Sequence, residues 1–224
     1  MPNILEIYDE LAAHHVEVTD RDKKRIQRAY DFAREAHEGQ ERNNGEAYFN
    51  HVFAAGKNCA RFGMGPTVVV AGLLHDTVED TKVTLQDIEK SFGKEVATLV
   101  DGVTKLGKLK YQGRDRHVES LRKFFVASAD DVRVVIIKMA DRVHNLETLE
   151  HVRPDKQRRI ALESIEIHAA LALRLGMAKV VTEIHELAFP FAYPQEYKEI
   201  ASFNGTKILL GCYKDYRRDC RKYL

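Results

Sequence analysis

The sequence predicts an all-α fold, a single helical bundle domain with additional helices at its C-terminal end. Apolar residues recur at spacings of three and four along most of the 224 residues, which is the period of an amphipathic helix. Pro, the residue that most disrupts helices, occurs only five times. Gly and Pro gather at a few points, such as residues 63–66, and these points separate one helical pattern from the next.

The first half of the chain is predicted to begin with a short helix within residues 1–19. The next helix begins at Asp20 and ends before Gly39, because its apolar residues recur at helical spacing. A polar loop follows, and an amphipathic pattern over residues 48–62 predicts the third helix. Residues 68–74 are rich in valine, which favours strands by propensity, but we interpret them as a fourth helix.

The second half of the chain is predicted to contain the longest helix. Apolar residues over positions 132–149 follow a spacing of three or four for five turns. A helix over residues 154–175 begins with Pro154, at a position where a helix start tolerates proline. Another helix runs over residues 177–189, and the tail over residues 202–224 is expected to be helical.

The composition argues against several classes of protein. Charged residues make up 31% of the chain and hydrophobic residues 44%, as in ordinary globular domains. The net charge of +1 gives no reason to expect a nucleic-acid or membrane partner, and no segment approaches the roughly 20 apolar residues that span a bilayer. The first ten residues do not form a signal peptide. Cys59, Cys212 and Cys220 are scattered and odd in number, so we expect a reducing cytoplasm.

The pair His75-Asp76 is the most informative feature of the chain. It directly follows the apolar run over residues 68–74, where an unpaired charge would be costly to bury. Glu79 and Asp80 come four residues after His75 and Asp76, so on a continuous helix each acid would stand one turn beyond a potential metal ligand. Four polar, metal-competent side chains within two turns indicate a site.

Two other predicted helices supply residues of the same chemistry. Lys138, Asp141, Asn145 and Thr148 share one polar stripe of the 132–149 helix. Asp141 is a candidate oxygen ligand, and Asn145 a candidate contact to whatever the metal holds. The candidate metal ligands are His51, His75, Asp76 and Asp141. This set of nitrogen and oxygen ligands suits Mn, Fe or Zn.

Each of these residues has an ordinary explanation when taken alone. A single histidine such as His51 is most often a satisfied core or surface residue. Asp141-Arg142 by itself would be a surface ion pair worth less than about 1 kcal/mol. The site is predicted because the residues occur together at the polar margins of strongly apolar helices. Of the remaining histidines, we interpret some as structural, namely His37, His144, His151, His168 and His185, and expect the others to be exposed, namely His14, His15 and His117.

The order His51, His75-Asp76, Asp141 resembles the HD superfamily of metal-dependent phosphohydrolases. Four longer segments resemble the hydrolase domain of RelA/SpoT homologues: residues 36–48 (AHEGQERNNGEAY), 74–81 (LHDTVEDT), 101–106 (DGVTKL) and 138–151 (KMADRVHNLETLEH). The resemblance covers roughly residues 20–200. It implies an HD-type phosphohydrolase domain over residues 20–201, in a small alarmone hydrolase or in the hydrolase part of a bifunctional enzyme.

The resemblance also implies a reaction and its residues. The small-molecule partner would be a guanine nucleotide alarmone, and water activated by a metal would convert ppGpp or pppGpp to GDP or GTP plus pyrophosphate. One Mn²⁺ per chain would be held by His51, His75, Asp76 and Asp141. Glu79 and Asp80 would hold and activate the water. The predicted substrate contacts are Arg42, Asn43, Asn44, Lys138, Asn145 and Thr148.

One departure from the family pattern keeps other functions open. Asn43-Asn44 stands where the family commonly has Lys-Ser, so one positive charge near the nucleotide is lost. The alternatives are hydrolysis of a related nucleotide, ppApp or the 2′-phosphate of NADPH, and a non-catalytic module that binds alarmone. Glu79 and Asp80 argue against the binding module, because a sensor needs no water-activating acids. A homo-oligomer is compatible with the sequence.

Overall fold

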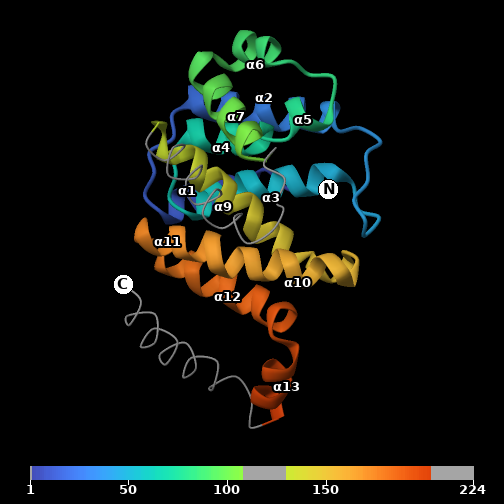
Figure 1. Ribbon diagram of the computed structural model, residues 1–224. Coiled ribbons are helices and arrows are strands. Elements are labelled where there is room, and N and C mark those ends of the chain that lie inside the picture. The colour runs from blue at the N-terminus through green and yellow to red at the C-terminus, as the bar shows by residue number, and fades with distance from the viewer. Residues whose placement is uncertain (1, 108–129, 203–224) are drawn as a thin grey trace. The chain divides into compact units, whose positions relative to one another are not determined.

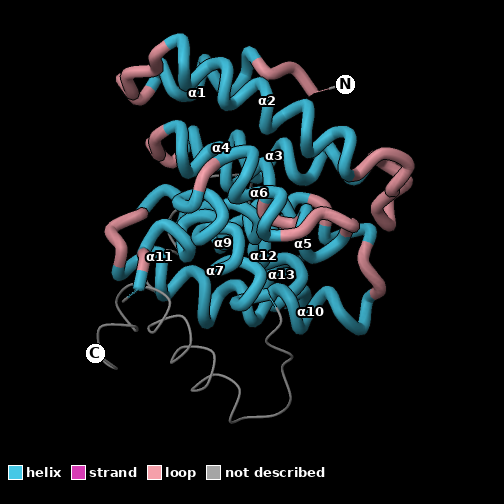
Figure 2. The backbone as a smooth tube through the Cα atoms, turned by 90° about the horizontal axis from the view of Figure 1, so that it is seen from above, coloured by secondary structure: helices cyan, strands magenta, loops and turns pink. Residues whose placement is uncertain are grey.

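The computed structural model describes residues 2–107 and 130–202, and within these ranges it is built from helices joined by loops (Figure 2). The all-α prediction is confirmed, since the one extended pairing in the described ranges is an isolated bridge between Glu41 and Ala47. The chain divides into two compact units, Met1–His151 and Val152–Leu224. The predicted tail helix falls almost wholly outside the described residues, and the domain boundaries 20–201 stay a prediction.

The first unit begins with α1 (Leu5–Ala13) and α2 (Asp20–Ala36), close to the predicted bounds. Thr19 and Asp22 form a capping box that fixes the start of α2, because each side chain accepts from the other residue's backbone N–H. The buried side of α2 includes Tyr30, whose ring meets Phe49 edge to face at 4.8 Å. This contact joins α2 to the next helix.

Three helices form the centre of the first unit: α3 (Tyr48–Arg61), α4 (Pro66–Leu74) and α9 (Val132–Glu147). They pack against one another (Figure 1). The valine-rich segment is therefore a helix, as predicted. Glycine permits the close approach of α3 and α4, because a Cβ on Gly72 would lie 2.9 Å from the Cys59 sulfur. Asn58 donates to the Ala140 carbonyl at 3.1 Å and ties α3 to α9.

The expectation of one continuous helix through His75 and Asp76 is wrong. The helix α4 ends at Leu74, and Asp76 is the N-cap of the short helix α5 (Thr77–Asp80). The Thr77 hydroxyl donates to the Leu74 carbonyl at 2.7 Å, which satisfies a backbone group at the interruption. The break allows the adjacent side chains to converge, with His75 Nε2 and Asp76 Oδ1 only 3.1 Å apart.

The helices α6 (Leu85–Phe92) and α7 (Lys94–Gly107) complete the described part of this unit, with the 3₁₀ turn η1 (Leu149–His151) after α9. Two arginines of α2 hold the end of α6. Arg25 donates to the Phe92 carbonyl at 2.8 Å and Arg28 to the Ser91 carbonyl at 3.2 Å. These bonds satisfy carbonyls that a helix end leaves without intrahelical partners.

The described part of the second unit consists of α10 (Pro154–Glu163), the π-helical segment η2 (Ser164–Ala169), α11 (Ala170–Arg174), α12 (Ala178–Ala192) and α13 (Pro194–Ser202). The prediction of one regular helix over residues 154–175 is wrong in its middle, where the backbone widens into η2. There the Ser164 hydroxyl donates to the Ile160 carbonyl at 2.7 Å. Across the ranges the structure describes, no helix combines the length and apolar character needed to cross a bilayer.

Candidate metal centre

The first unit brings all four predicted metal ligands into one cluster. His51 Nε2 lies 3.3 Å from Asp76 Oδ2 and 3.3 Å from Asp141 Oδ1. His75 Nε2 lies 3.9 Å from the same Asp141 oxygen. Ligand atoms of His51, His75 and Asp141 all lie within 4.8 Å of one another, and these three residues are buried. Two of them come from α3 and α9 and the third directly follows α4, so the packing of the unit's centre creates a candidate metal site.

The hydrogen bonds of His75 fit a metal ligand. Its Nδ1 lies 2.9 Å from the Gly72 carbonyl, which can only accept, so Nδ1 carries a proton and Nε2 is the nitrogen that would bind a cation after losing its own proton. Nε2 is buried and has no hydrogen-bond partner of acceptable geometry among the described residues, although Asp76 lies close by. A buried imidazole nitrogen beside two carboxylates is an arrangement that a divalent cation satisfies. The two imidazoles and two carboxylates form a set that suits a first-row metal.

The protein's own cations balance the two carboxylates. Burial would raise the pKa of Asp76, but His75 and His51 outweigh it and hold that pKa well below its usual value. Burial would also raise the pKa of Asp141. Lys138 and His51 outweigh burial and hold that pKa well below its usual value. Burial lowers the pKa of His75, but the nearby carboxylates of Asp76 and Asp141 outweigh burial and raise this pKa to about 9.

We expect metal-free protein to lose stability as pH rises through the titration of His75. The folded-state pKa of about 9 lies above the ordinary value of 6.5, so the folded state holds the proton more tightly. The contribution is fully present below pH 6.5 and lost as pH passes 9, an effect on the order of 3 kcal/mol. Urea unfolding in EDTA across this range measures it. The variant His75→Gln should lack the dependence, and an equal slope in both proteins would contradict the assignment.

Several predicted substrate contacts bond instead to Asp141 or to its neighbours. Lys138 Nζ lies 2.5 Å from Asp141 Oδ2, and Asn145 Nδ2 donates to Asp141 Oδ1 at 2.5 Å. Arg42 Nη2 donates to Asn145 Oδ1 at 2.6 Å. Thr148 donates its hydroxyl to the His144 carbonyl at 3.2 Å. In this structure, these residues therefore hold Asp141 and the end of α9 in place.

Arg42 is presented by a tight loop between α2 and α3. The backbone N–H of Arg42 donates to the Glu46 carbonyl at 2.9 Å, and Gly45 turns the chain with a φ of +79°. Asn44 Oδ1 accepts from the Glu46 N–H at 3.1 Å, whereas Asn43 is exposed. The structure thus gives Asn44 a role in the loop and leaves the predicted substrate contacts of both asparagines as predictions.

His144 contacts the cluster, although its sequence position favours a purely structural role. Its Nδ1 lies 2.9 Å from His51 Nδ1, and Arg42 Nη1 lies 3.1 Å from the same atom. Burial, followed by the neighbouring His51 and Arg42, lowers the pKa of His144 to about 3, so the ring is neutral. A signal was present in the sequence, because His144 follows Asp141 by three residues and three-residue neighbours share a helix face.

Tyr48 is a second contact that the sequence did not predict. Its hydroxyl lies 2.8 Å from Asp76 Oδ2 and 2.7 Å from Asp80 Oδ2. Burial and then Asp76 raise the pKa of Tyr48, so the phenol keeps its proton and donates to one of the two carboxylates at a time. The ring stacks on His37 at 4.9 Å. Tyr48 precedes His51 by three residues, which again is helical-face spacing.

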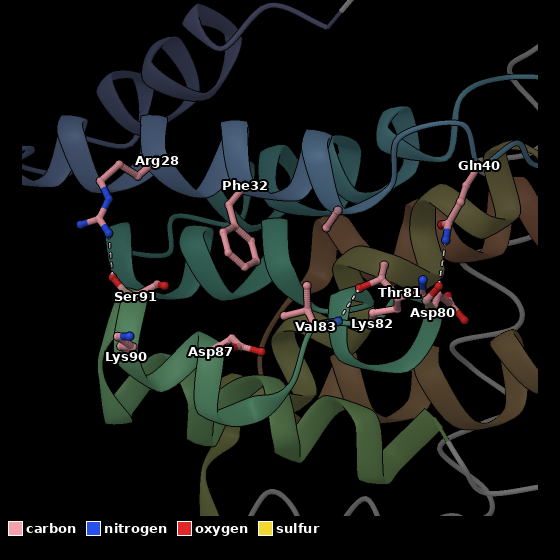
Figure 3. Close-up of a pocket in the computed structure, with 11 residues that line it drawn as sticks. Arg28, Phe32, Gln40, Asp80, Thr81, Lys82, Val83, Asp87, Lys90 and Ser91 are labelled. Carbon is pink, nitrogen blue, oxygen red and sulfur yellow. Dashed lines mark hydrogen bonds between the residues drawn. The ribbon is translucent and has the colours of Figure 1, made fainter.

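Asp80 lines a surface cleft (Figure 3). The Tyr48 hydroxyl lies between its carboxylate and that of Asp76 in the cluster. Gln40 Nε2 donates to the Asp80 carbonyl at 2.8 Å, and the Asp80 carboxylate is held by Tyr48. The cleft has a volume of about 880 Å³ and runs between α2 and α6. Its polar lining includes Arg28, Gln40, Asp80, Lys82, Asp87 and Lys90. Glu79 is exposed on α5, one residue before Asp80. A ligand in the cleft can therefore approach Asp80.

The fold and the cluster define a class of protein: helical domains that gather histidines and aspartates, including an adjacent His-Asp pair, into one buried candidate metal site. Residues 29–178 match the HD domain family, and the chain belongs to that family. Relatives that are 41% and 48% identical confirm the predicted resemblance to RelA/SpoT homologues.

These relatives are much longer than the part that matches. The bifunctional (p)ppGpp synthase/hydrolase SpoT of Escherichia coli (strain K12) is 48% identical over 178 residues, which are 79% of this chain and 25% of that protein. The guanosine-3′,5′-bis(diphosphate) 3′-pyrophosphohydrolase of Aquifex aeolicus is 41% identical over 199 residues, 89% of this chain and 27% of that protein. This chain thus spans about a quarter of these curated relatives.

A solved structure shares the fold. It is described as "A metazoan ortholog of SpoT hydrolyzes ppGpp and plays a role in starvation responses". The match has a TM-score of 0.59 and 23% sequence identity, and covers 73% of this chain and 93% of that chain. At this level of identity the likeness concerns the fold.

Proposed function

We propose that this chain is a metal-dependent hydrolase of ppGpp and pppGpp, which removes the 3′-pyrophosphate and leaves GDP or GTP. The observation that carries the proposal is the convergence of His51, His75, Asp76 and Asp141 beside Asp80. The names of relatives at 41% and 48% identity point to the same reaction. The cluster supplies ligand chemistry for a cation, and Asp80 supplies a proton acceptor at its edge.

We propose that His51, His75, Asp76 and Asp141 hold one Mn²⁺ per chain. The choice of Mn²⁺ rests on the family resemblance, because the same ligand set also suits other first-row cations. When bound, the cation would lower the pKa of a water molecule and offset negative charge on the phosphoryl group.

The acids on α5 are assigned to the attacking water. Asp80 accepts the proton as the water oxygen attacks the phosphorus attached to the ribose 3′-oxygen. The bond from that phosphorus to the 3′-oxygen breaks, the 3′-oxygen takes a proton from solvent, and pyrophosphate is released. Tyr48 keeps the Asp80 carboxylate in place through its 2.7 Å hydrogen bond, and Glu79 is assigned to holding the water.

Arg42 is assigned to the guanine base. Its bonds to Asn145 and to His144 use N–H groups in the plane of the guanidinium, so they do not occupy the flat face that stacks on a base. Arg42 could therefore contact a nucleotide while keeping its place beside the cluster. The remaining assigned substrate contacts are Asn43, Asn44, Lys138, Asn145 and Thr148.

Metal removal tests the function directly. Purified protein treated with EDTA is expected to retain less than about a tenth of its turnover of ppGpp, and added Mn²⁺ should restore it. Release of pyrophosphate and GDP is measured by anion-exchange chromatography. Turnover that survives complete chelation would contradict the proposed metal dependence.

A substrate panel separates the two alternative functions. The pair Asn43-Asn44 is the feature that favours a related nucleotide, because the lysine common in the family is missing. Faster turnover of ppApp or NADPH than of ppGpp would assign the enzyme to that substrate. Tight binding of ppGpp without any turnover in Mn²⁺ would instead identify an alarmone-binding module.

We propose that residues 20–201 form the hydrolase domain and that the protein is cytoplasmic. A homo-oligomer is compatible with this proposal. The buried thiol of Cys59 needs no oxidising environment. Light scattering coupled to gel filtration measures the oligomeric state.

A further inference from the structure

We propose that His144 is a positioning residue, which accepts a hydrogen bond from His51 and thereby holds the His51 Nε2 lone pair toward the carboxylates. The inference rests on the proposed metal site and adds a residue that the ligand set does not contain. It concerns the state of the His51 ring and not the chemistry of the substrate.

The distance between the two rings requires one shared proton. The Nδ1 atoms of His51 and His144 are 2.9 Å apart, a hydrogen-bond distance. Two bare lone pairs at this distance would repel, and two N–H groups would collide. One ring therefore donates to the other, and the identity of the donor decides which nitrogen of His51 is available elsewhere.

The other side of His51 decides the direction of this bond. His51 Nε2 lies 3.3 Å from an oxygen of Asp76 and 3.3 Å from an oxygen of Asp141. A cation held by these groups needs the Nε2 lone pair, and a neutral imidazole then carries its proton on Nδ1. The Nδ1–H of His51 consequently donates to His144 Nδ1.

The surroundings of His144 suit an acceptor. Arg42 Nη1 lies 3.1 Å from His144 Nδ1 and 3.2 Å from His51 Nδ1, and a guanidinium can only donate. Once His51 Nδ1 carries the proton, the bare Nδ1 of His144 is the nitrogen of the two that can accept from Arg42. The ring is buried, so no bulk water replaces these partners. The Nε2 atom of His75 is likewise directed toward the carboxylates, because its Nδ1–H donates to the Gly72 carbonyl. Partners of this kind fix the tautomer and orientation of a metal-binding imidazole.

Two substitutions of His144 separate positioning from packing. His144→Asn places an amide oxygen near the former Nδ1 and keeps an acceptor, whereas His144→Leu removes it. We expect His144→Leu to weaken Mn²⁺ binding about 10- to 100-fold, and His144→Asn to stay within about threefold of wild type. Titration of EDTA-treated protein with Mn²⁺, followed by electron paramagnetic resonance, measures the affinity. The variant His168→Leu removes a buried histidine of the second unit and serves as the control.

The tautomer of His51 can be measured directly, and a role of His144 in packing alone would not change it. In protein loaded with diamagnetic Zn²⁺, long-range ¹⁵N–¹H spectra should show His51 protonated on Nδ1 in wild type and in His144→Asn. Equal Mn²⁺ affinity of wild type and His144→Leu would overturn the inference, as would equal weakening by His144→Asn. Wild-type protein that binds no Mn²⁺ would overturn both the metal site and the inference. The expected affinity order in a protein that does not hydrolyse ppGpp would support the inference and overturn only the proposed function.

Discussion

Asp80→Asn is expected to lower kcat for ppGpp by a factor of about 10² to 10⁴ while Mn²⁺ affinity changes little. The amide keeps the size of the carboxylate and still accepts from the Tyr48 hydroxyl, whose distance to Asp80 is 2.7 Å. It cannot take a proton from water at neutral pH. Single-turnover assays at saturating Mn²⁺ measure the chemical step, and Mn²⁺ titration of the same preparation measures metal binding.

Glu79→Gln is the matched comparison, because it makes the same chemical change at the neighbouring position. If Asp80 accepts the proton and Glu79 only holds the water, Glu79→Gln should lose less rate than Asp80→Asn. A larger loss of rate in Glu79→Gln than in Asp80→Asn would make Glu79 the proton acceptor and Asp80 the residue that holds the water. Full activity in Asp80→Asn would remove that residue from the mechanism.

The sequence was sufficient to predict most helices because their signal is local. The pattern over residues 132–149 repeats for five turns, and α9 occupies Val132–Glu147. The interruptions were harder to predict. The break after Leu74 and the π-helical segment from Ser164 each accompany a hydroxyl that bonds a nearby backbone carbonyl. Whether such a bond forms depends on packing, and residue spacing does not reveal it.

The candidate ligands could be found from sequence because metals need a few residue types with lone pairs. The outer contacts could not be assigned in the same way. Tyr48 and His144 have ordinary structural explanations. The contact of Tyr48 depends on how α3 meets residues 76–80, and the contact of His144 depends on how α3 meets α9. Lys138 and Asn145 were correctly placed on the polar stripe of α9, but the sequence could not show that both bond Asp141.

Lys138→Met is expected to destabilise metal-free protein by about 3 to 5 kcal/mol. Asp141 is buried, and Lys138 Nζ lies 2.5 Å from its carboxylate. Methionine keeps most of the apolar stem of lysine, so the change removes the charge with little loss of packing. The remaining carboxylate would be buried beside Asp76 with one fewer compensating cation. Urea unfolding in EDTA at pH 7 measures the loss.

A double-mutant cycle distinguishes the ion pair from other effects of Lys138. In Lys138→Met combined with Asp141→Asn, the uncompensated charge is gone, so the loss should be clearly smaller than the sum of the single losses. Mn²⁺ should reduce the loss in Lys138→Met alone, because the cation would take over the compensation of Asp141. A loss below about 1 kcal/mol with a raised KM for ppGpp would show that Lys138 acts mainly on the substrate. The two roles predict opposite patterns, since a structural cation matters most without metal and a substrate contact matters only during turnover.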